Sequence, residues 1–274
     1  MAASLDPCAC LETVEALARD AGRRILEIYR TEFTVTRKAD RSPVTEADHA
    51  AQAIILAGLA RLAPDVPVLA EESAEVPYRQ RAGWTRFWLV DPLDGTKEFV
   101  GRNGEFTVNI ALIERGAPVL GVVHVPVPDL TYAACRGGGA YKRTGAGAPT
   151  AIRAARYDGS RPPRVVASRS HARRADAEFL ARLGPHELRA IGSSLKFCLV
   201  AEGAADVYPR LGTTMEWDTA AAHCIVEQAG GRVVDAHNRP LRYNKPSLES
   251  PWVIACGAGD WDWTRYLPPA GEAG

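Results

Sequence analysis

Apolar residues near the start of the chain recur every three or four positions, which is the spacing of one face of an α-helix. Residues 7–30 carry such a face, and Asp6 and Pro7 suit the cap and the first turn of a helix. The predicted buried face comprises Leu11, Val14, Leu17, Ala18, Ala21, Ile25 and Ile28. A second helix is predicted over residues 45–62.

Shorter apolar runs separated by tight turns follow these helices. The runs predicted as strands are 68–70, 86–91, 106–114, 118–126, 130–135 and 140–143. Consecutive strands joined by such short turns favour an antiparallel sheet. The glycines at 137–139 join two of the strands, and we expect a hairpin there because no helix follows. The first half of the chain is therefore predicted to be α+β.

The pattern changes after the turn-rich segment YDGSRPP at 157–163, where strands and helices alternate. Strands are predicted at 165–167, 188–191, 205–208, 232–234 and 252–256. Helices are predicted at 174–183, 194–202 and 219–229. This is the pattern of an α/β unit. We expect an N-terminal domain over 1–157 and a C-terminal domain over 158–274.

The composition of the 274 residues is that of a globular protein, with 46% apolar and 24% charged residues. Because 33 basic residues balance 33 acidic ones, the net charge gives no reason to expect nucleic acid or an anionic membrane as a partner. The start of the chain lacks the pattern of a signal peptide, and no apolar run approaches the roughly 18 residues of a transmembrane helix.

The six cysteines include no C-x-x-C pair, which argues against a structural zinc site. Cys135, Cys198, Cys224 and Cys256 lie in apolar runs, where we expect free thiols that behave as small buried hydrophobes. Free thiols suggest a reducing compartment, and we expect a cytoplasmic protein.

Two aspartates lie at the end of the predicted strand at 86–91 and in the turn that follows it. Asp91 and Asp94 are three residues apart, with Pro92 between them and Gly95 after them. Carboxylates this close repel one another unless a proton or a cation neutralises them, and hard cations such as Mg²⁺ take oxygen ligands. The residues alone leave a cation site and an ordinary surface turn equally open.

Further candidate groups lie at the ends of other predicted elements. Gly95, Thr96 and Lys97 are predicted to open a helical turn, whose N–H groups can bind phosphate. Glu71 and Glu72 follow a strand, and alternation lets at most one of them reach a common site. Asp48 and Asp218 are two further acidic candidates for the site, but each could have a purely structural role instead. Asp48 fits a capping box at a helix start, and Asp218 fits a helix N-cap.

Four segments together define a resemblance. They are SPVTEAD at 42–48, LAEES at 69–73, WLVDPLDGTKEF at 88–99 and WDTAA at 217–221. In sequence, order and spacing they resemble the inositol monophosphatase family of lithium-sensitive, magnesium-dependent phosphatases. The resemblance implies a layered αβαβα sandwich of the sugar-phosphatase type, with an antiparallel N-terminal sheet and a mixed C-terminal sheet.

Three other segments resemble a bacterial branch of this family that acts on 3'(2'),5'-bisphosphate nucleotides. They are GRNGEFTVNIALIERG at 101–116, RPPRVVASRSH at 161–171 and IGSSLKFCLVAEG at 191–203. Lys97 and Lys196 fall within the motifs, and a second phosphate on the substrate would favour such cations.

The resemblance implies a role for each matching residue. Two or three Mg²⁺ ions are expected, the first held by Glu71, Asp91 and the backbone carbonyl of Leu93, and the second by Asp91, Asp94 and Asp218. Asp94, Gly95, Thr96 and Lys97 would cradle the phosphate that is cleaved, and Ser193, Ser194 and Lys196 would contact the substrate. Thr96, paired with Asp48, would orient the attacking water and accept its proton.

The implied reaction is hydrolysis of adenosine 3',5'-bisphosphate to AMP and phosphate in support of sulfate assimilation, by a monomer or homodimer. Peripheral attachment to the cytoplasmic face of the inner membrane is compatible with this role. The alternatives are activity on inositol monophosphate or fructose 1,6-bisphosphate. An alternative of another class is a binding module that has lost catalysis.

Overall fold

The computed structural model describes residues 5–37, 43–169 and 173–269. Ser42, Ser170 and His171 of the quoted segments lie outside these ranges. The helices are α1 (Pro7–Tyr29), α2 (Glu46–Leu62), α3 (Tyr78–Arg81), α4 (Thr96–Val100), α5 (Arg174–Leu183), α6 (Leu195–Ala201), α7 (Glu216–Gln228) and the 3-10 helix η1 (Thr264–Tyr266). No helix in the described ranges is both long and apolar enough to cross a membrane.

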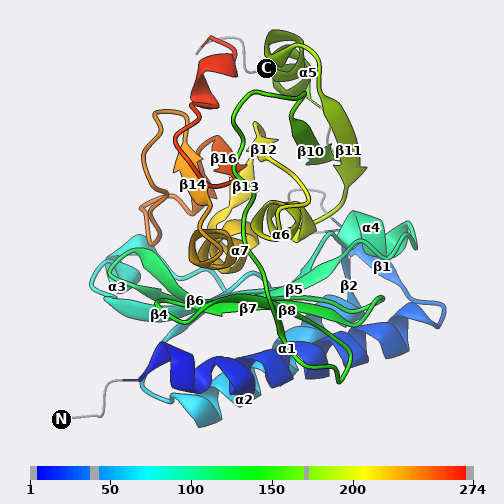
Figure 1. The fold of residues 1–274 in the computed structure, drawn as a ribbon. Helices are drawn as coiled ribbons and strands as arrows, with labels where there is room; N and C mark the ends of the chain where they lie inside the picture. The colour runs from blue at the N-terminus through cyan, green and yellow to red at the C-terminus, as the bar shows by residue number, and fades with distance from the viewer. Residues whose placement is uncertain (1–4, 38–42, 170–172, 270–274) are drawn as a thin grey trace.

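Five layers stack in the order predicted by the resemblance (Figure 1). Helices α1 and α2 cover one face of a seven-stranded sheet, and α6 and α7 lie between its other face and a five-stranded sheet. The far face of the five-stranded sheet packs against side chains of α5 and η1, including Leu180, Leu183 and Tyr266. The αβαβα sandwich is thereby confirmed.

The two N-terminal helices form for the reasons that the sequence indicates. Asp6 caps α1 by accepting a hydrogen bond from the Cys8 N–H at 3.0 Å, and the predicted apolar face is buried against the sheet. Thr45 and Asp48 form the predicted capping box at the start of α2.

The seven-stranded sheet has the order β3-β4-β5-β6-β7-β8-β9. Its strands are β3 (Val68–Ala70), β4 (Arg86–Asp94), β5 (Thr107–Glu114), β6 (Ala117–Val125), β7 (Leu130–Cys135), β8 (Gly139–Thr144) and β9 (Thr150–Ala151). All neighbours from β4 to β9 are antiparallel, as predicted, and only β3 and β4 at one edge are parallel. The pair is parallel because the chain crosses over through α3 instead of turning back directly.

Strand β4 also differs from its prediction, because it continues beyond Asp91 to Asp94. Its pairing with β5 shifts register between these two residues, which marks a β-bulge or similar irregularity. Such an irregularity re-aims side chains locally.

The five-stranded sheet is mixed, as predicted, with the order β11-β10-β12-β16-β14. Its strands are β10 (Arg164–Ser168), β11 (Glu187–Ile191), β12 (Val207–Arg210), β14 (Arg232–Asp235) and β16 (Val253–Cys256). Two further pairs, β1 (Val35–Arg37) with β2 (Pro43–Thr45) and β13 (Thr214–Met215) with β15 (Glu249–Ser250), were too short to predict. Residues 157–163 connect the two large sheets, and the domain boundary there stays a prediction.

Helix α7 joins the two sheets by packing closely on β6. A Cβ atom added at Gly121 would lie 2.1 Å from the Ala221 carbonyl oxygen, so only glycine permits this approach. The helix also begins three residues before its predicted start, which places Asp218 in its first turn instead of in front of it.

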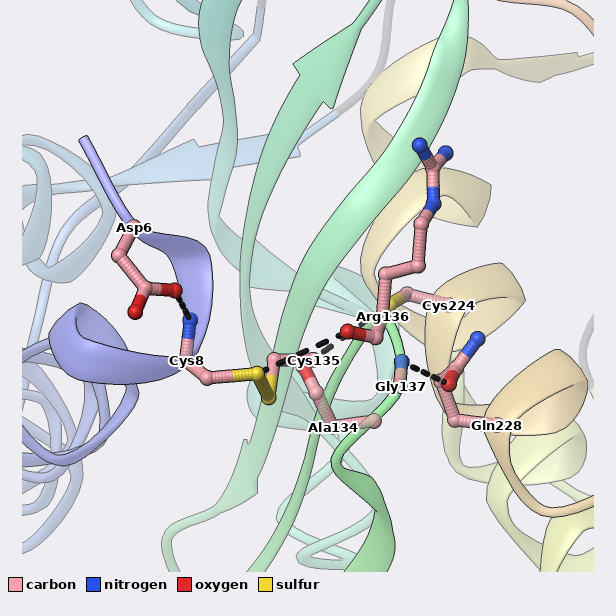
Figure 2. Close-up of a disulfide and its surroundings, with 8 residues drawn as sticks. All are labelled: Asp6, Cys8, Ala134, Cys135, Arg136, Gly137, Cys224 and Gln228. Carbon is pink, nitrogen blue, oxygen red and sulfur yellow. Dashed lines mark hydrogen bonds between the residues drawn. A yellow bond between two sulfur atoms is a disulfide. The ribbon is translucent and has the colours of Figure 1, made fainter. Parts of the chain in front are cut away.

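A disulfide bond joins Cys8 of α1 to Cys135 at the end of β7 (Figure 2). The prediction of a free thiol at Cys135 is therefore wrong, whereas Cys198, Cys224 and Cys256 are buried and free as predicted. The two partners are 127 residues apart in sequence, and only the docking of α1 on the sheet brings them together. The cysteines consequently no longer support a reducing compartment.

A buried aspartate joins the starts of β10 and β12, two inner strands of the five-stranded sheet. Asp206 is fully buried and accepts hydrogen bonds from Arg161 and Arg164, which lower its pKa to about 2. A lowered carboxyl pKa adds stability above the unfolded value near 4, and this stability is lost as pH falls towards 2.

We therefore expect Asp206→Asn to reduce the free energy of unfolding by about 2 kcal/mol at pH 7. Urea denaturation of both proteins between pH 7 and pH 3 measures this difference, which should shrink on the acid side. A difference that stays constant with pH would contradict the ion-pair explanation.

Candidate active site

The predicted site residues come together at one end of the seven-stranded sheet. They line a cavity of about 520 Å³ that is shared with α6 and α7. The predicted residues in its wall are Glu71, Asp94, Gly95, Thr96, Lys97, Ser193, Ser194, Lys196 and Asp218. Asp48, Asp91 and Leu93 are buried and lie outside the cavity wall.

The parallel register of β3 and β4 decides which glutamate belongs to the site. Ala70 pairs with Val90, and the Glu71 N–H donates to the Val90 carbonyl at 3.1 Å, so Glu71 lies next to Asp91. Glu72 instead places its N–H against the Gln52 side chain at 3.0 Å. Of the two glutamates, Glu71, which the resemblance names, is therefore the one that lies at the cavity.

The acidic side chains raise one another's pKa. Burial raises the pKa of Asp91 well above its ordinary value, and the charges of Glu71, Asp94 and Asp218 raise it further. Burial and then Asp218 raise the pKa of Asp94 to about 6, although Lys196 and the Ser194 N–H oppose this. Burial and Glu71 raise the pKa of Asp218. Oxygen ligands that repel one another in a buried site are the donor set that suits a divalent cation.

Each carboxylate is held by protein donors. Asp94 Oδ2 accepts from the Ser194 N–H at 2.5 Å, and Asp218 Oδ2 accepts from the Thr214 hydroxyl at 2.6 Å and the Met215 N–H at 2.9 Å. Within the described ranges, no three His, Cys, Asp or Glu side chains are already closed around one point as an ion cage. One oxygen of Asp94 and one of Asp218 are therefore fixed by protein donors.

Thr96 and Asp48 are neighbours, as the resemblance implies. The Thr96 hydroxyl lies 3.4 Å from Asp48 Oδ1 and 3.4 Å from the Leu93 carbonyl oxygen. Asp48 Oδ2 is occupied by the capping box, in which it accepts from the Thr45 N–H and hydroxyl at 2.8 Å each. The cap thus fixes one carboxylate oxygen and leaves the other directed towards Thr96.

The segment 193–196, from the second half of the chain, contributes residues to the cavity wall and hydrogen bonds around it. The Ser194 hydroxyl lies 2.9 Å from that of Thr107 and donates to Asn109 Oδ1 at 2.8 Å. Lys196 Nζ donates to the carbonyls of Ile191 at 3.2 Å and Ser193 at 2.6 Å. Burial lowers the pKa of Lys196 to about 8. Contacts of these residues with substrate stay predictions.

The cavity wall also contains residues that the sequence did not single out. They are Arg173, Tyr208, Arg210, Thr214, Trp217 and Glu249, among others. Trp217 precedes Asp218 in the WDTAA segment, so its position was a usable signal. The others lie in loops and short strands without a motif, and only the assembled fold places them at the cavity.

Residues 8–262 match the model of the inositol monophosphatase family, and the chain belongs to that family. The 3'(2'),5'-bisphosphate nucleotidase CysQ of Shigella flexneri is 52% identical over 235 residues, covering 85% of this chain and 93% of that protein. CysQ of Haemophilus influenzae is 36% identical, covering 92% and 94%. The crystal structure of CysQ from Bacteroides thetaiotaomicron matches with a TM-score of 0.80 at 44% identity, covering 91% and 97%. The predicted family and branch are confirmed.

Proposed function

We propose that this protein is a magnesium-dependent phosphomonoesterase that removes the 3'-phosphate of adenosine 3',5'-bisphosphate. The observation that carries the proposal is the set of mutually repelling carboxylates beside a cavity that also contains Lys196 and Arg210. A site of this kind suits a cation together with an anionic substrate. The choice of substrate rests on the CysQ relatives, whose names give 3'(2'),5'-bisphosphate nucleotidase activity.

We assign the cation ligands as the resemblance implies. Glu71, Asp91 and the Leu93 carbonyl would hold one Mg²⁺, and Asp91, Asp94 and Asp218 a second; a third is compatible with the family. In this chain, the assignment is supported by the charges of Glu71, Asp94 and Asp218, which are close enough to raise the pKa of Asp91. Bound magnesium would lower the pKa of a water and offset negative charge on phosphate oxygens.

The chain's own residues orient the reactants. The Thr96 hydroxyl would hold the attacking water, and its proton would pass through Thr96 Oγ1 to Asp48 Oδ1, which lie 3.4 Å apart. The bond between water oxygen and phosphorus forms as the bond to the ribose 3'-oxygen breaks; that oxygen takes up a proton from solvent water, and Asp48 returns to solvent the proton it accepted, so that one water is consumed overall. Asp94, Gly95, Thr96 and Lys97 would surround this phosphate, and Ser193, Ser194 and Lys196 would contact the rest of the substrate.

A substrate panel tests the proposal. Phosphate release is measured with adenosine 3',5'-bisphosphate, inositol 1-phosphate and fructose 1,6-bisphosphate, each with Mg²⁺ or with a chelator. We expect kcat/KM for the nucleotide to exceed the others by about 100-fold, because a site built for a second phosphate loses its charge-assisted hydrogen bonds when that phosphate is missing or misplaced.

The outcomes separate the alternatives. Preference for inositol 1-phosphate or fructose 1,6-bisphosphate would replace the substrate assignment and leave the phosphatase class intact. No magnesium-dependent release from any compound would favour a binding module without catalysis. Lithium added to the nucleotide reaction is expected to inhibit it, as in the lithium-sensitive members of the family.

We also infer a cytoplasmic location from the bacterial relatives, with a monomer or homodimer as the working unit. The disulfide between Cys8 and Cys135 makes this location testable, since disulfides persist mainly in oxidising environments. Thiol alkylation in intact cells should find both cysteines reduced if the location is right.

A further inference from the structure

The three segments that resemble the nucleotidase branch meet at one ion pair beside the candidate site. Arg169 donates from Nε and Nη2 to the two carboxylate oxygens of Glu105 at 2.9 and 2.8 Å. Glu105 Oε2 also accepts from the Gly192 N–H at 2.8 Å, and Arg169 Nη2 donates to the Ala190 carbonyl at 2.9 Å. Glu105, which lies just before β5, is thus connected by hydrogen bonds to the residues that directly follow β10 and β11.

The turn at 192–194 is held tightly by this pair. A Cβ atom at Gly192 would lie 2.7 Å from the Glu105 carbonyl oxygen and 2.5 Å from Glu98 Cγ, so the two backbones are in direct contact. Ser193 has a φ of 50°, a left-handed conformation that non-glycine residues adopt only where their surroundings enforce it. The hydrogen bond to Glu105 fixes Gly192, the residue directly before Ser193.

The other side of the same turn contacts a proposed metal ligand. The Ser194 N–H donates to Asp94 Oδ2 at 2.5 Å, and the Ser194 hydroxyl is fixed by Thr107 and Asn109. A continuous series of polar contacts therefore runs from Arg169 through Glu105 and the turn to Asp94.

We propose that Glu105 and Arg169 are positioning residues for catalysis. Their ion pair holds the 192–194 turn in the position from which the Ser194 N–H can bond to and orient Asp94. This inference rests on the proposed function, since it assumes that the orientation of Asp94 matters for turnover. Neither residue lines the cavity, so their effect on the reaction passes through the turn.

Glu105→Ala, Glu105→Gln and the control Glu114→Ala test the proposal. Glu114 is the last residue of β5 and pairs with Arg86 at 2.7 Å, so the control removes an ion pair at the end of β5 that is farther from Glu105. We expect Glu105→Ala to lower kcat by about 10- to 100-fold with KM changed less than about threefold, because small displacements of reacting groups cost turnover. Glu105→Gln keeps an oxygen for the Gly192 N–H, and its kcat should fall by less than about fivefold.

Amide hydrogen exchange gives a readout that does not depend on activity. Exchange in 191–196 should rise about tenfold in Glu105→Ala and stay unchanged in Glu114→Ala, because only the first change frees the turn. Unchanged exchange, or a kcat for Glu105→Ala within about twofold of the control, would overturn the proposal. Failure of the proposed function would appear differently, as absent nucleotide turnover in the unaltered protein; the kinetic comparison would then use whichever phosphomonoester that protein hydrolyses.

Discussion

Asp94→Asn is expected to lower kcat by about a thousandfold, because it removes a charge from the proposed cation site at the cavity wall. The fold should survive, since the Asn oxygen can still accept from the Ser194 N–H that now bonds Asp94 at 2.5 Å. Steady-state kinetics with Mg²⁺ and a circular dichroism spectrum measure the two effects. Turnover near that of the unaltered protein would remove Asp94 from the metal site.

The same substitution should stabilise the protein when a chelator is present. Burial and Asp218 raise the pKa of Asp94 to about 6, so ionised Asp94 destabilises the fold above that pH. A raised carboxyl pKa costs stability that is absent below pH 4 and complete above pH 6. Asp94→Asn should therefore gain roughly 1–3 kcal/mol at pH 8 and little at pH 4.

A matched control for charge removal is Asp20→Asn on α1. Asp20 pairs with Arg23 on the exposed surface of α1, and α1 covers the face of the seven-stranded sheet opposite α6 and α7 (Figure 1). Its removal should change neither turnover nor the response to Mg²⁺. Added Mg²⁺ should raise the melting temperature of this control and of the unaltered protein, and raise that of Asp94→Asn much less, since a ligand stabilises only the state that binds it.

Breaking the bond between Cys8 and Cys135 is expected to lower the free energy of unfolding by about 3–4 kcal/mol. The bond closes a loop with a sequence separation of 127, so its loss gives the unfolded chain much more freedom. Denaturant unfolding of Cys8→Ser, and of the unaltered protein with and without reductant, measures the effect. The free cysteine Cys10, two residues away, provides the control Cys10→Ser, whose stability should still respond to reductant.

Turnover of folded Cys8→Ser should be unchanged. The loop after Cys135 contacts the C-terminal end of α7, where the Gly137 N–H donates to Gln228 at 2.9 Å (Figure 2). Asp218 lies in the first turn of that helix, at its other end. Reductant that destabilises Cys8→Ser as much as the unaltered protein would show that the bond is not the cause.

The candidate site was predicted through the family resemblance, which short local segments carry, whereas the residues alone left a surface turn and helix caps as equal alternatives. Asp91 and Asp94 lie in one short segment, and Asp48 and Asp218 lie in helix first turns whose surrounding residues the sequence shows directly. The helices α1 and α2 were predictable for the same reason, because periodicity and caps are encoded within a few neighbouring residues.

Features that depend on distant pairing were not predictable. The parallel pairing of β3 with β4 places Glu71 beside Asp91, and strand alternation alone did not distinguish Glu71 from Glu72. Cys8 with Cys135, and Glu105 with Arg169, meet only after the layers assemble. Their partners are 127 and 64 residues away, beyond the reach of any pattern in a single sequence.

The glycine at 121 has a mechanical consequence. Ala221, which meets it backbone to backbone, lies three residues after Asp218 in α7. Side chains yield to a neighbour by changing rotamer, but two main chains in contact have almost no such compliance. The spacing between Asp218 and the carboxylates of β4 is therefore a stiff dimension of the scaffold. Any side chain at position 121 would push α7 away from β6 and change this spacing.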